Sequence, residues 1–595
     1  MGLIRNRIEC DFCVVGGGMA GMSAAIAAAR EGLKVVLMHE RPVLGGNASS
    51  EIRMWICGAQ GENNRETGLL EEIALENLYR NPSKNYPIWD TVLYDFVKRE
   101  KNIELLLNCS CMEAETEKGN FADGRDTRIL SVTGYQMTTQ SFFEVHARFY
   151  ADCSGDSILA PLCQAEFRLG REDENEQNQD GPFEMKDDIT MGMSCLLQGR
   201  ETTREVPFTA PEFSKKLVEK DFENRKLDIR KDSENYWYLE LGGKQDTIAD
   251  TEILRDELVS LAVGTWDHIK NSGKFDAETW DLDFLGFLPG KRESRRMMGE
   301  IMITLKDISS GRIFEDEIAY GGWPLDDHFP GGFYHRGKPN TNIPTPAPYS
   351  LPYRALYSEN VENLFFAGRN ISMTHIAMSS IRVMATCALL GEAVGKAAFL
   401  AVSHQHTPHG VYQHDLHQLQ SLLMNEDCFL PHFHREISDH CLQAQLVGAK
   451  DSIRNGQDRD HELYHTELQS GICHCPSGST VTYNFDETEV HSVHIVFNSD
   501  LNRLSLPVSR CERQHSMRCN QRLDSPLMTM PSTLCRSFVL TGQLAGVETE
   551  ICAVENNRKR SYHFKLDQKF DHLCLTLKGA WNQDETVDLI SFDFN

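Results

Sequence analysis

Three glycines near the N-terminus, Gly16, Gly18 and Gly21, form the pattern G-x-G-x-x-G. The first allows a tight turn, the second lets the backbone approach a pyrophosphate, and the third lets a helix pack closely on a strand. Glu40 follows 19 residues after Gly21, where a carboxylate can accept hydrogen bonds from a ribose diol. The spacing predicts a dinucleotide site, although a tight turn without a ligand would use the same glycines.

These residues need a strand, a helix and a second strand to position them. The apolar segment 11–15 predicts the first strand, the alanine-rich segment 20–31 predicts the helix, and "KVVLMH" before Glu40 predicts the second strand. The amino end of such a helix offers free N–H groups and the positive end of a dipole to phosphates.

A cluster of arginines lies in "PGKRESRRMMGE", which places Arg292, Arg295 and Arg296 within five residues. On a helix, Arg292 would share a face with each of the other two. Guanidinium groups bind carboxylates, phosphates and vicinal hydroxyls through pairs of N–H donors. The segment therefore predicts either a binding site for such groups or a surface turn with salt bridges.

The loop "GGWPLDDHFPGG" combines Trp323 with Asp326, Asp327 and His328. A flat apolar ring beside hydrogen-bonding groups suits a sugar or another polyol, but an irregular loop could have the same composition. A little further on, "SLPYRALYS" places Arg354 shortly before an apolar segment. We treat both stretches as candidates for contact with a substrate.

The composition limits the partners. The chain has 595 residues, so several domains are expected. Its net charge of -27, from 60 basic and 87 acidic residues, argues against nucleic acid and anionic membranes, because both need a cationic surface. No apolar run reaches the length of roughly 18 residues needed to cross a bilayer, and no signal sequence is visible, so we expect a cytoplasmic protein with free thiols. The oligomeric state is left open.

The dinucleotide-binding unit is not followed by further alternating strands and helices. A polar, glycine-rich stretch, "RPVLGGNASSEIRMWICGA", comes next, then a helical segment at about 67–100, a strand at 103–108 and strand-rich sequence at 127–150. Much later, "NLFFAGRNISMTHIAMSSIRVMATCALLGEAVGKAA" again predicts a strand, a glycine turn and a helix. This order of blocks resembles the glutathione-reductase-like FAD-binding fold, and more narrowly the bacterial FAD-dependent oxidoreductases, over roughly residues 10–400.

The resemblance implies an α/β fold: a Rossmann-like FAD-binding domain with an inserted substrate domain. The alternating pattern of the C-terminal third adds an all-β sandwich. The expected boundaries are 1–160 and 355–402 for the two parts of the FAD-binding domain, 161–354 for the substrate domain, 403–455 for a helical linker and 456–595 for the sandwich.

The same resemblance implies that FAD, and not NAD, is the bound dinucleotide. Many relatives have an aspartate after the late glycine, where this chain has Arg369 and Asn370. A helix beginning near Ser379 is expected to direct its N–H groups toward the flavin. The residues expected to hold FAD are Gly16, Gly18, Met19, Ala20, Gly21, Glu40, Arg41, Gly45, Gly46, Asn47, Asp152, Gly155, Gly368, Arg369, Ser379, Ser380, Arg382 and Val383.

By the resemblance, "SMTHIAMSS" brings His375 close to the flavin ring, as a base or a substrate-orienting group. A packing role for this histidine is the alternative. Arg53, Trp55 and Cys57 are expected to line one face of the flavin. The residues expected to act in catalysis are His375, Arg295, Arg296, His328 and Arg354.

The C-terminal third differs in pattern. Residues 404–440 carry eight histidines. We interpret the stretch as a polar linker with helices; metal binding is the alternative, although no coherent tetrahedral set of ligands appears. From about 456, apolar and polar residues alternate between turns, which predicts antiparallel strands. The stretch "VHIVFNSDLNR" resembles a core strand of galactose-binding-like jelly rolls.

The leading functional hypothesis is an FAD-dependent oxidoreductase that transfers a hydride from a small polar organic substrate to flavin N5. A sugar or sugar acid is the candidate substrate. Two other hypotheses are a glycan-binding protein with an inactive flavin fold and a flavin-dependent lyase or isomerase without net redox change.

Overall fold

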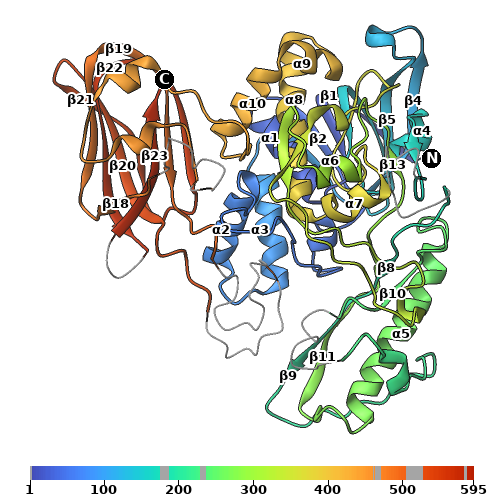
Figure 1. The fold of residues 1–595 in the computed structure, drawn as a ribbon. Helices are drawn as coiled ribbons and strands as arrows, with labels where there is room; N and C mark the ends of the chain where they lie inside the picture. Colours follow the sequence, from blue (N-terminus) through green and yellow to red (C-terminus); the bar gives the residue numbers. More distant parts are fainter. Residues whose placement is uncertain are drawn as a thin grey trace.

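The computed structural model describes residues 3–173, 186–227, 236–459, 461, 471–503, 517, 527–581 and 586–595. Figure 1 shows an antiparallel sheet region at the C-terminal end, a central body of sheet and helices, and a projecting segment that contains α5, β9 and β11. Three buried hydrophobic clusters correspond to these parts. The large cluster of the central body combines residues from 12 to 429 and Met517.

The central sheet has the strand order β3-β2-β1-β6-β5-β4, with β16 paired to β6. The pairs β1–β2, β2–β3, β1–β6 and β6–β16 are parallel, whereas β4–β5 and β5–β6 are antiparallel. The carboxyl ends of β1, β2, β6 and β16 therefore meet at one edge. The strands are β1 (Ile4–Val15), β2 (Val35–Met38), β3 (Ile103–Leu106), β4 (Cys109–Lys118), β5 (Thr127–Gln136), β6 (Ser141–Asp152) and β16 (Leu364–Phe366).

Strand β6 joins the early and late parts of the chain. Its first half pairs with β5, for example Val145 with Val132. Its last residues pair with β16, where Asp152 lies opposite Phe366. The predicted return of the late segment to the first sheet is confirmed.

Helices α1 (Met19–Arg30) and α8 (Met384–His404) pack against each other through small residues. A Cβ on Gly391 would lie 2.0 Å from the Ala20 carbonyl oxygen, and one on Gly395 would lie 2.4 Å from the Ala24 carbonyl oxygen. Larger side chains would force the helices apart. The late helix is thus fixed against the helix that follows the glycine pattern.

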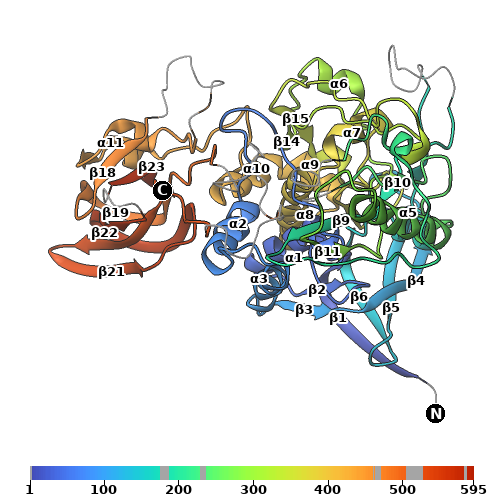
Figure 2. The ribbon, with the colours of Figure 1, turned by 90° about the horizontal axis from the view of Figure 1, so that it is seen from below.

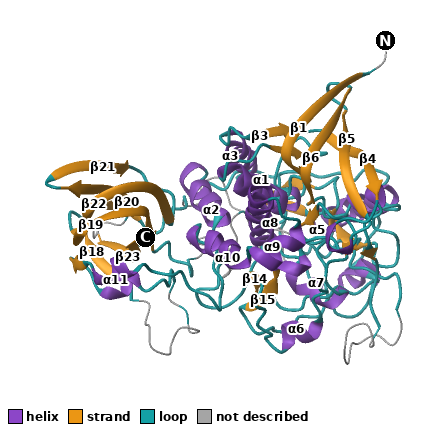
Figure 3. Cartoon of the chain, turned by 90° about the horizontal axis from the view of Figure 1, so that it is seen from above, coloured by secondary structure: helices purple, strands orange, loops and turns teal. Residues whose placement is uncertain are grey.

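Helix α8 has the length and mean hydropathy, 1.5, of a membrane-crossing segment, which the sequence analysis did not identify. In this fold 89% of that window is buried inside the protein. Figure 3 shows α8 among the helices that lie between the central sheet and the C-terminal sheet. Its apolar composition is explained by this position in the core.

Two helical expectations change. The segment 67–100 forms two helices, α2 (Leu69–Arg80) and α3 (Tyr86–Lys98), because Pro82 follows the first and the Asn85 side chain caps the second by accepting from Ile88 N–H. No helix begins near Ser379. That residue lies inside α7 (His375–Ile381), and α8 starts after Val383.

The segment between β6 and β16 forms short strands around α5 (Thr251–Asn271), and Figure 2 shows α5 on the far side of the molecule from the C-terminal sheet. The other elements are α4 (Leu159–Cys163), β7 (Phe167–Arg168), β8 (Met193–Ser194), β9 (Leu197–Glu201), β10 (Glu240–Leu241), β11 (Trp280–Leu285), β12 (Gly290–Lys291), β13 (Arg296–Met297), α6 (Leu305–Ser309), β14 (Glu317–Gly321) and β15 (Tyr349–Pro352).

The C-terminal part is an antiparallel sheet of order β18-β23-β19-β22-β20-β21, with β17 paired to β19. It is preceded by the helices α9 (Pro408–His414), α10 (Leu416–Asn425) and α11 (Asp439–Gln443). The strands are β17 (Gln445–Val447), β18 (Cys473–Pro476), β19 (Thr480–Phe497), β20 (Cys535–Leu544), β21 (Val547–Val554), β22 (Ser561–Ala580) and β23 (Thr586–Phe594).

Buried ion pairs join this sheet region to the central body. Arg503 donates to both carboxylate oxygens of Glu71 on α2, at 2.7 and 2.8 Å, and Ser499 Oγ donates to the same carboxylate at 2.6 Å. Arg560 donates to Asp427 at 2.9 Å. Because Glu71, Asp427 and Arg560 are buried, separating the two parts would expose or unpair charged groups.

Candidate functional site

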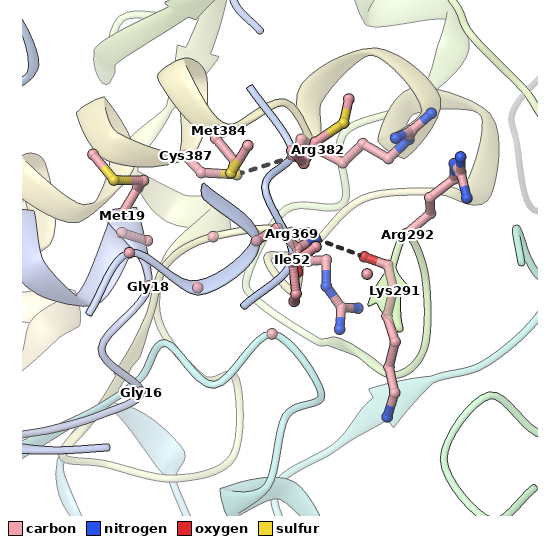
Figure 4. A pocket seen from close by; sticks show the side chains of 18 of the residues that line it. Gly16, Gly18, Met19, Ile52, Lys291, Arg292, Arg369, Arg382, Met384 and Cys387 are labelled. Carbon is pink, nitrogen blue, oxygen red and sulfur yellow. Dashed lines mark hydrogen bonds between the residues drawn. The ribbon is translucent and has the colours of Figure 1, made fainter. Parts of the chain in front are cut away.

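A cavity of about 420 Å³ lies at the sheet edge where β1, β2, β6 and β16 end. Open parallel sheets bind ligands in this position, outside the carboxyl ends of their strands. The turns that follow the four strands contribute residues 16–20, 39–41, 153–156 and 368–369 to its wall. Figure 4 shows the cavity with the early glycines on one side and the side chains of Arg292 and Arg382 on the other.

The glycine turn has the geometry that its pattern predicts. Gly16 has φ +110°, and a Cβ there would lie 2.3 Å from the Cys153 carbonyl oxygen, so only glycine fits. A Cβ on Gly18 would meet only the Gly46 Cα, at 3.9 Å. The backbone at Gly18 thus lies open beside the cavity, where a phosphate could approach it.

A second glycine turn supports the first. Gly45 has φ +100° and donates its N–H to the Gly17 carbonyl at 2.9 Å. Gly18 and Gly45 form a parallel bridge. The predicted residues Met19, Ala20, Gly46 and Asn47 line the same wall. The start of α1 has no side-chain cap, so its first N–H groups are available to a ligand.

The prediction that Gly21 contacts the cofactor is corrected. It does not line the cavity: a Cβ there would lie 1.8 Å from the Gly16 carbonyl oxygen. Its role is to let α1 pack against the turn from behind.

The residues after β2 form an acid–base group at one end of the cavity. Gly17 N–H donates to His39 Nδ1 at 3.0 Å, and His39 Nε2 therefore carries the proton donated to the Val43 carbonyl. Burial opposes ionisation of Glu40, but the Arg41 guanidinium beside it lowers its pKa. Nε and Nη1 of Arg41 are buried and make no hydrogen bond with the described residues. These donors and the ionised Glu40 suit a phosphate–ribose group.

The turns after β6 and β16 meet through Asp156. Its carboxylate accepts from Lys291 Nζ at 2.8 Å, Ser294 Oγ at 2.7 Å and Arg369 Nη2 at 2.5 Å. Burial opposes ionisation, but Arg369 and Lys291 hold the pKa of Asp156 well below its ordinary value. The Arg369 guanidinium lies directly over Gly155. Arg369 thus replaces the carboxylate that many relatives of the resembled family have at this turn.

The opposite end of the cavity is made of side chains. Trp55, Cys57, Trp323 and Val383 form a buried apolar cluster, and all four line the cavity. The segment "RMWICGA" and the loop "GGWPLDDHFPGG" therefore meet, although about 270 residues separate them.

Arg292 and Arg382 lie at this end, with their guanidinium groups near each other in Figure 4. Arg292 Nη1 donates to Ser194 Oγ at 3.0 Å and lies 3.7 Å from a Glu240 oxygen. Arg382 Nη2 donates to the Asp326 carboxylate at 3.2 Å. Burial lowers the pKa of Arg292; Glu240 opposes that shift, and Arg382 adds to it. The two cations are therefore close enough to repel each other.

Asp326 is the carboxylate beside Arg382 on the cavity wall, and it connects to a buried histidine. His328 Nδ1 lies 2.6 Å from Glu240 Oε2, and its Nε2 lies 3.4 Å from Asp326 Oδ2. Burial opposes ionisation of Asp326, but His328 and Arg382 hold its pKa well below the ordinary value. The predicted residue His328 thus lies behind the wall and reaches the cavity only through Asp326.

His375 differs from its prediction. It does not line the cavity and is 2% exposed. Nδ1 lies 2.7 Å from Glu293 and Nε2 lies 3.1 Å from Asp327. Burial opposes the charge, but these two carboxylates raise the pKa of His375 to about 9. Held as a buried cation at neutral pH, it is not available as a base for a ligand in the cavity.

The catalytic roles predicted for three arginines are also corrected. Arg296 is buried between Glu172, at 2.6 Å, and Glu293, and Arg354 makes a bidentate pair with Asp316 at 2.8 and 2.9 Å. Arg295 donates to the Asp156 carbonyl at 3.4 Å. The cavity wall does not include the three arginines, so their contacts are structural.

Three predicted cofactor residues lie behind the wall. Asp152 is buried and accepts from Ser154 and from Leu159 N–H at 2.8 Å, which fixes the turn after β6. Ser379 donates to the Ile376 carbonyl, and Ser380 bonds to Tyr349 and Trp323. All three support the lining and do not form it.

Several residues that line the cavity were not predicted as ligand contacts. The signal for Cys153, Ser154 and Asp156 was present, because they follow an apolar strand with small and acidic residues. Lys291 lies next to the noted arginine cluster, and only the pairing of β12 with β8 brings it to the cavity.

Residues 11–423 match the family model described as FAD dependent oxidoreductase, and the chain belongs to that family. The glycine turns, the uncapped start of α1, the unbonded donors of Arg41 and the ionised Glu40 fit the ADP part of FAD.

The individual relatives are distant. A segment of 112 residues is 36% identical to 4-oxocyclohex-2-ene-1-carboxylate 5-dehydrogenase of Sinomonas cyclohexanicum, and the match covers 17% of this chain and 18% of that protein. The structure of p-nitrophenol 4-monooxygenase PnpA from Pseudomonas putida is 10% identical over 70% of this chain and 86% of its own, with a TM-score of 0.30. A family 32 carbohydrate-binding module of C. perfringens NanJ is 10% identical over 26% of this chain and 91% of its own, with a TM-score of 0.16.

Proposed function

We propose that this oxidoreductase is a dehydrogenase of a small organic acid, a class that includes sugar acids. The observation that carries the proposal is the pair Arg292 and Arg382 at the apolar, tryptophan-lined end of the cavity. Arg382 and Val383, which the sequence assigned to FAD binding, are here assigned to the substrate end instead. A bound FAD supplies the hydride acceptor, flavin N5. The residues of this chain would bind the acid, orient it and accept the proton released with the hydride.

The two arginines have more donors than the protein uses. Among the described residues, no hydrogen bond reaches Nη2 or Nε of Arg292, or Nη1 or Nε of Arg382. Asp326, the acceptor beside Arg382, is already bonded to Arg382, His328 and Asn340. The remaining donors suit a ligand with acceptor oxygens, and a carboxylate matches the paired donors of a guanidinium group.

The walls at the same end fit the rest of such a substrate. Trp55, Trp323 and Val383 give flat apolar surfaces, which exclude water from the group that loses the hydride. A neutral sugar would offer these donors only hydroxyl oxygens, whereas the carboxylate of a sugar acid matches the paired donors of a guanidinium group. The substrate is therefore proposed as an organic acid.

Asp326 is the proposed proton acceptor. Oxidation of a C–H bond releases a hydride and, from a neighbouring O–H or C–H group, a proton. Asp326 is ionised and lines the cavity beside Arg382. A hydroxyl that loses a hydride from its carbon becomes strongly acidic, so even a carboxylate of low pKa can take its proton.

The partial relative adds limited support. Its name describes a dehydrogenase of a cyclic carboxylate, which is an organic acid. The remaining features are proposed from the sequence. They are the Rossmann-like character of the first domain, the stated domain boundaries, a galactose-binding-like sandwich, a bacterial source, a cytoplasmic location, and the absence of nucleic-acid and membrane partners.

The test is an anaerobic titration of the FAD-loaded protein with hydroxy acids and cyclic carboxylic acids, each paired with its primary amide. We expect at least one acid to bleach the oxidised flavin band and its amide to fail. R382Q should raise the acid concentration needed by about 10- to 100-fold, because hydrogen bonds to charged groups contribute about 1.5–3 kcal/mol.

The control is R312Q. Arg312 is half exposed and pairs with Asp307 outside the cavity, so its loss should leave the titration unchanged. Equal bleaching by acids and amides would overturn the assignment of an acid. Turnover of an acid without bleaching would indicate a lyase or isomerase.

A further inference from the structure

A cluster of possible metal ligands lies at the carboxyl end of α8, outside the lining of the flavin cavity. We propose that His404, His406 and Asp415 bind a divalent transition metal, with zinc as the favoured ion. His404 is the last residue of α8, His406 lies in the turn that follows, and Asp415 lies between α9 and α10. From the sequence, the histidine-rich stretch was interpreted as a linker. Asp415 was not considered there as a metal ligand.

The ligand atoms already converge. His404 Nδ1 lies 2.9 Å from Asp415 Oδ1, and His406 Nδ1 lies 2.6 Å from Asp415 Oδ2. One ligand atom of each residue falls within 4.8 Å of the others. The His414 ring lies 5.0 Å from that of His406 and is a further imidazole beside the cluster.

The donor set selects the metal. Imidazole nitrogen with a carboxylate oxygen suits zinc and related first-row ions, whereas magnesium and calcium prefer oxygen alone. Zinc bonds of about 2.0–2.1 Å in a tetrahedron separate the ligand atoms by about 3.3 Å. The two nitrogen–oxygen distances to Asp415 are shorter than this value by less than about 1 Å. The exposed His404 side chain can move to lengthen its distance.

The charge of Asp415 gives an independent reason for a cation. Its side chain is 7% exposed, and among the described residues its ion pairs are with the two imidazoles and with no lysine or arginine. A buried carboxylate needs a compensating charge. A bound divalent ion would supply that charge and would accept the imidazole nitrogens at the same time.

Such a site would join three segments. Helix α8 begins at the cavity with Val383 and Met384, and the cluster is at its other end. A metal there would fix the end of α8 to the α9–α10 junction. We therefore infer a structural role and not a place in the oxidation.

The test measures zinc binding to the full-length, FAD-loaded protein by calorimetry, with the metal content determined after dialysis. We expect one zinc per chain, and with cobalt as the probe a visible absorption band of a nitrogen–oxygen site. H404Q and D415N should each weaken zinc binding more than about tenfold. The unchanged flavin spectrum would show that each variant is folded.

The matched control is H417Q. His417 belongs to the same histidine-rich segment, is mostly exposed and pairs with Glu436 at 3.4 Å, so zinc binding should not change. Equal weakening in H417Q and H404Q would mean adventitious binding by surface histidines and would overturn the proposal. So would the absence of zinc and cobalt binding in the wild-type protein.

Discussion

The two ends of the cavity are built from different material. At one end, backbone turns at Gly16, Gly18 and Gly45 leave space beside the start of α1. At the other end, Arg292 and Arg382 extend from segments 90 residues apart toward a wall of tryptophans. The first end depends on conformations that only glycine allows, and the second on side chains that tertiary structure brings together.

The difference assigns separate roles to the ends. The backbone end suits a ligand common to the whole family, because N–H groups and φ angles carry little substrate information. The side-chain end has charges and rings that can differ between relatives and set the substrate. Substitutions at the two ends should therefore fail in different ways.

The largest effect is expected at the backbone end. G16A would place a Cβ 2.3 Å from the Cys153 carbonyl oxygen in a backbone conformation with φ +110°. The turn must open, and FAD affinity should fall at least about 100-fold, as expected when backbone cannot approach a pyrophosphate. Flavin absorbance per chain after gel filtration measures the loss.

G32A separates the backbone strain of a positive φ angle from the steric clash of an added Cβ atom. Gly32 also has a positive φ, +97°, but a Cβ there meets nothing within 4 Å. We expect a stability loss of about 1 kcal/mol and normal FAD content. A G16A protein that remains fully yellow would contradict the glycine-turn assignment.

The next effect concerns two adjacent aspartates. D326N removes the ionised carboxylate on the cavity wall, so the rate of flavin reduction by substrate should fall by about 10²- to 10⁴-fold. D327N removes a partner of His375 behind the wall and should leave that rate within a few-fold. Stopped-flow reduction compares them, and similar losses in both variants would refute the role of Asp326.

The smallest effect is a pH dependence of stability. Glu293 and Asp327 raise the pKa of His375 to about 9 from an ordinary 6.5. The folded state thus holds this proton more tightly than the unfolded state. The stabilisation, on the order of 3 kcal/mol at most, is complete below pH 6.5 and is lost as the pH rises through about 9.

Urea unfolding between pH 6 and 10 checks this result. The free energy of unfolding of the wild-type protein should fall with pH more steeply than that of H375Q, which lacks the titrating group. Parallel curves would show that His375 is not held as a cation. The rate of flavin reduction at pH 7 is then compared between the wild-type protein and H375Q. Similar rates are expected for a structural role of His375, and a large loss for a catalytic one.

Prediction from sequence succeeded where local rules apply. The segment 20–31 became α1 (Met19–Arg30), and the strand before Glu40 became β2 (Val35–Met38). It failed where a residue's surroundings come from distant segments. His375 and Arg296 have suitable chemistry for catalysis. Both are buried, however, and their charges are paired with those of Glu293 and Glu172.

The sequence by itself determined the backbone half of the site, because the conformations of Gly16 and Gly45 and the order of strand and helix are local properties. Only the tertiary structure decided which charged side chains reach the cavity. Arg292, Asp326 and Arg382 are near each other because β12, the loop after β14 and the end of α7 converge there. The physical reason is that charge and burial depend on neighbours in space, which the chain supplies from positions far apart in the sequence.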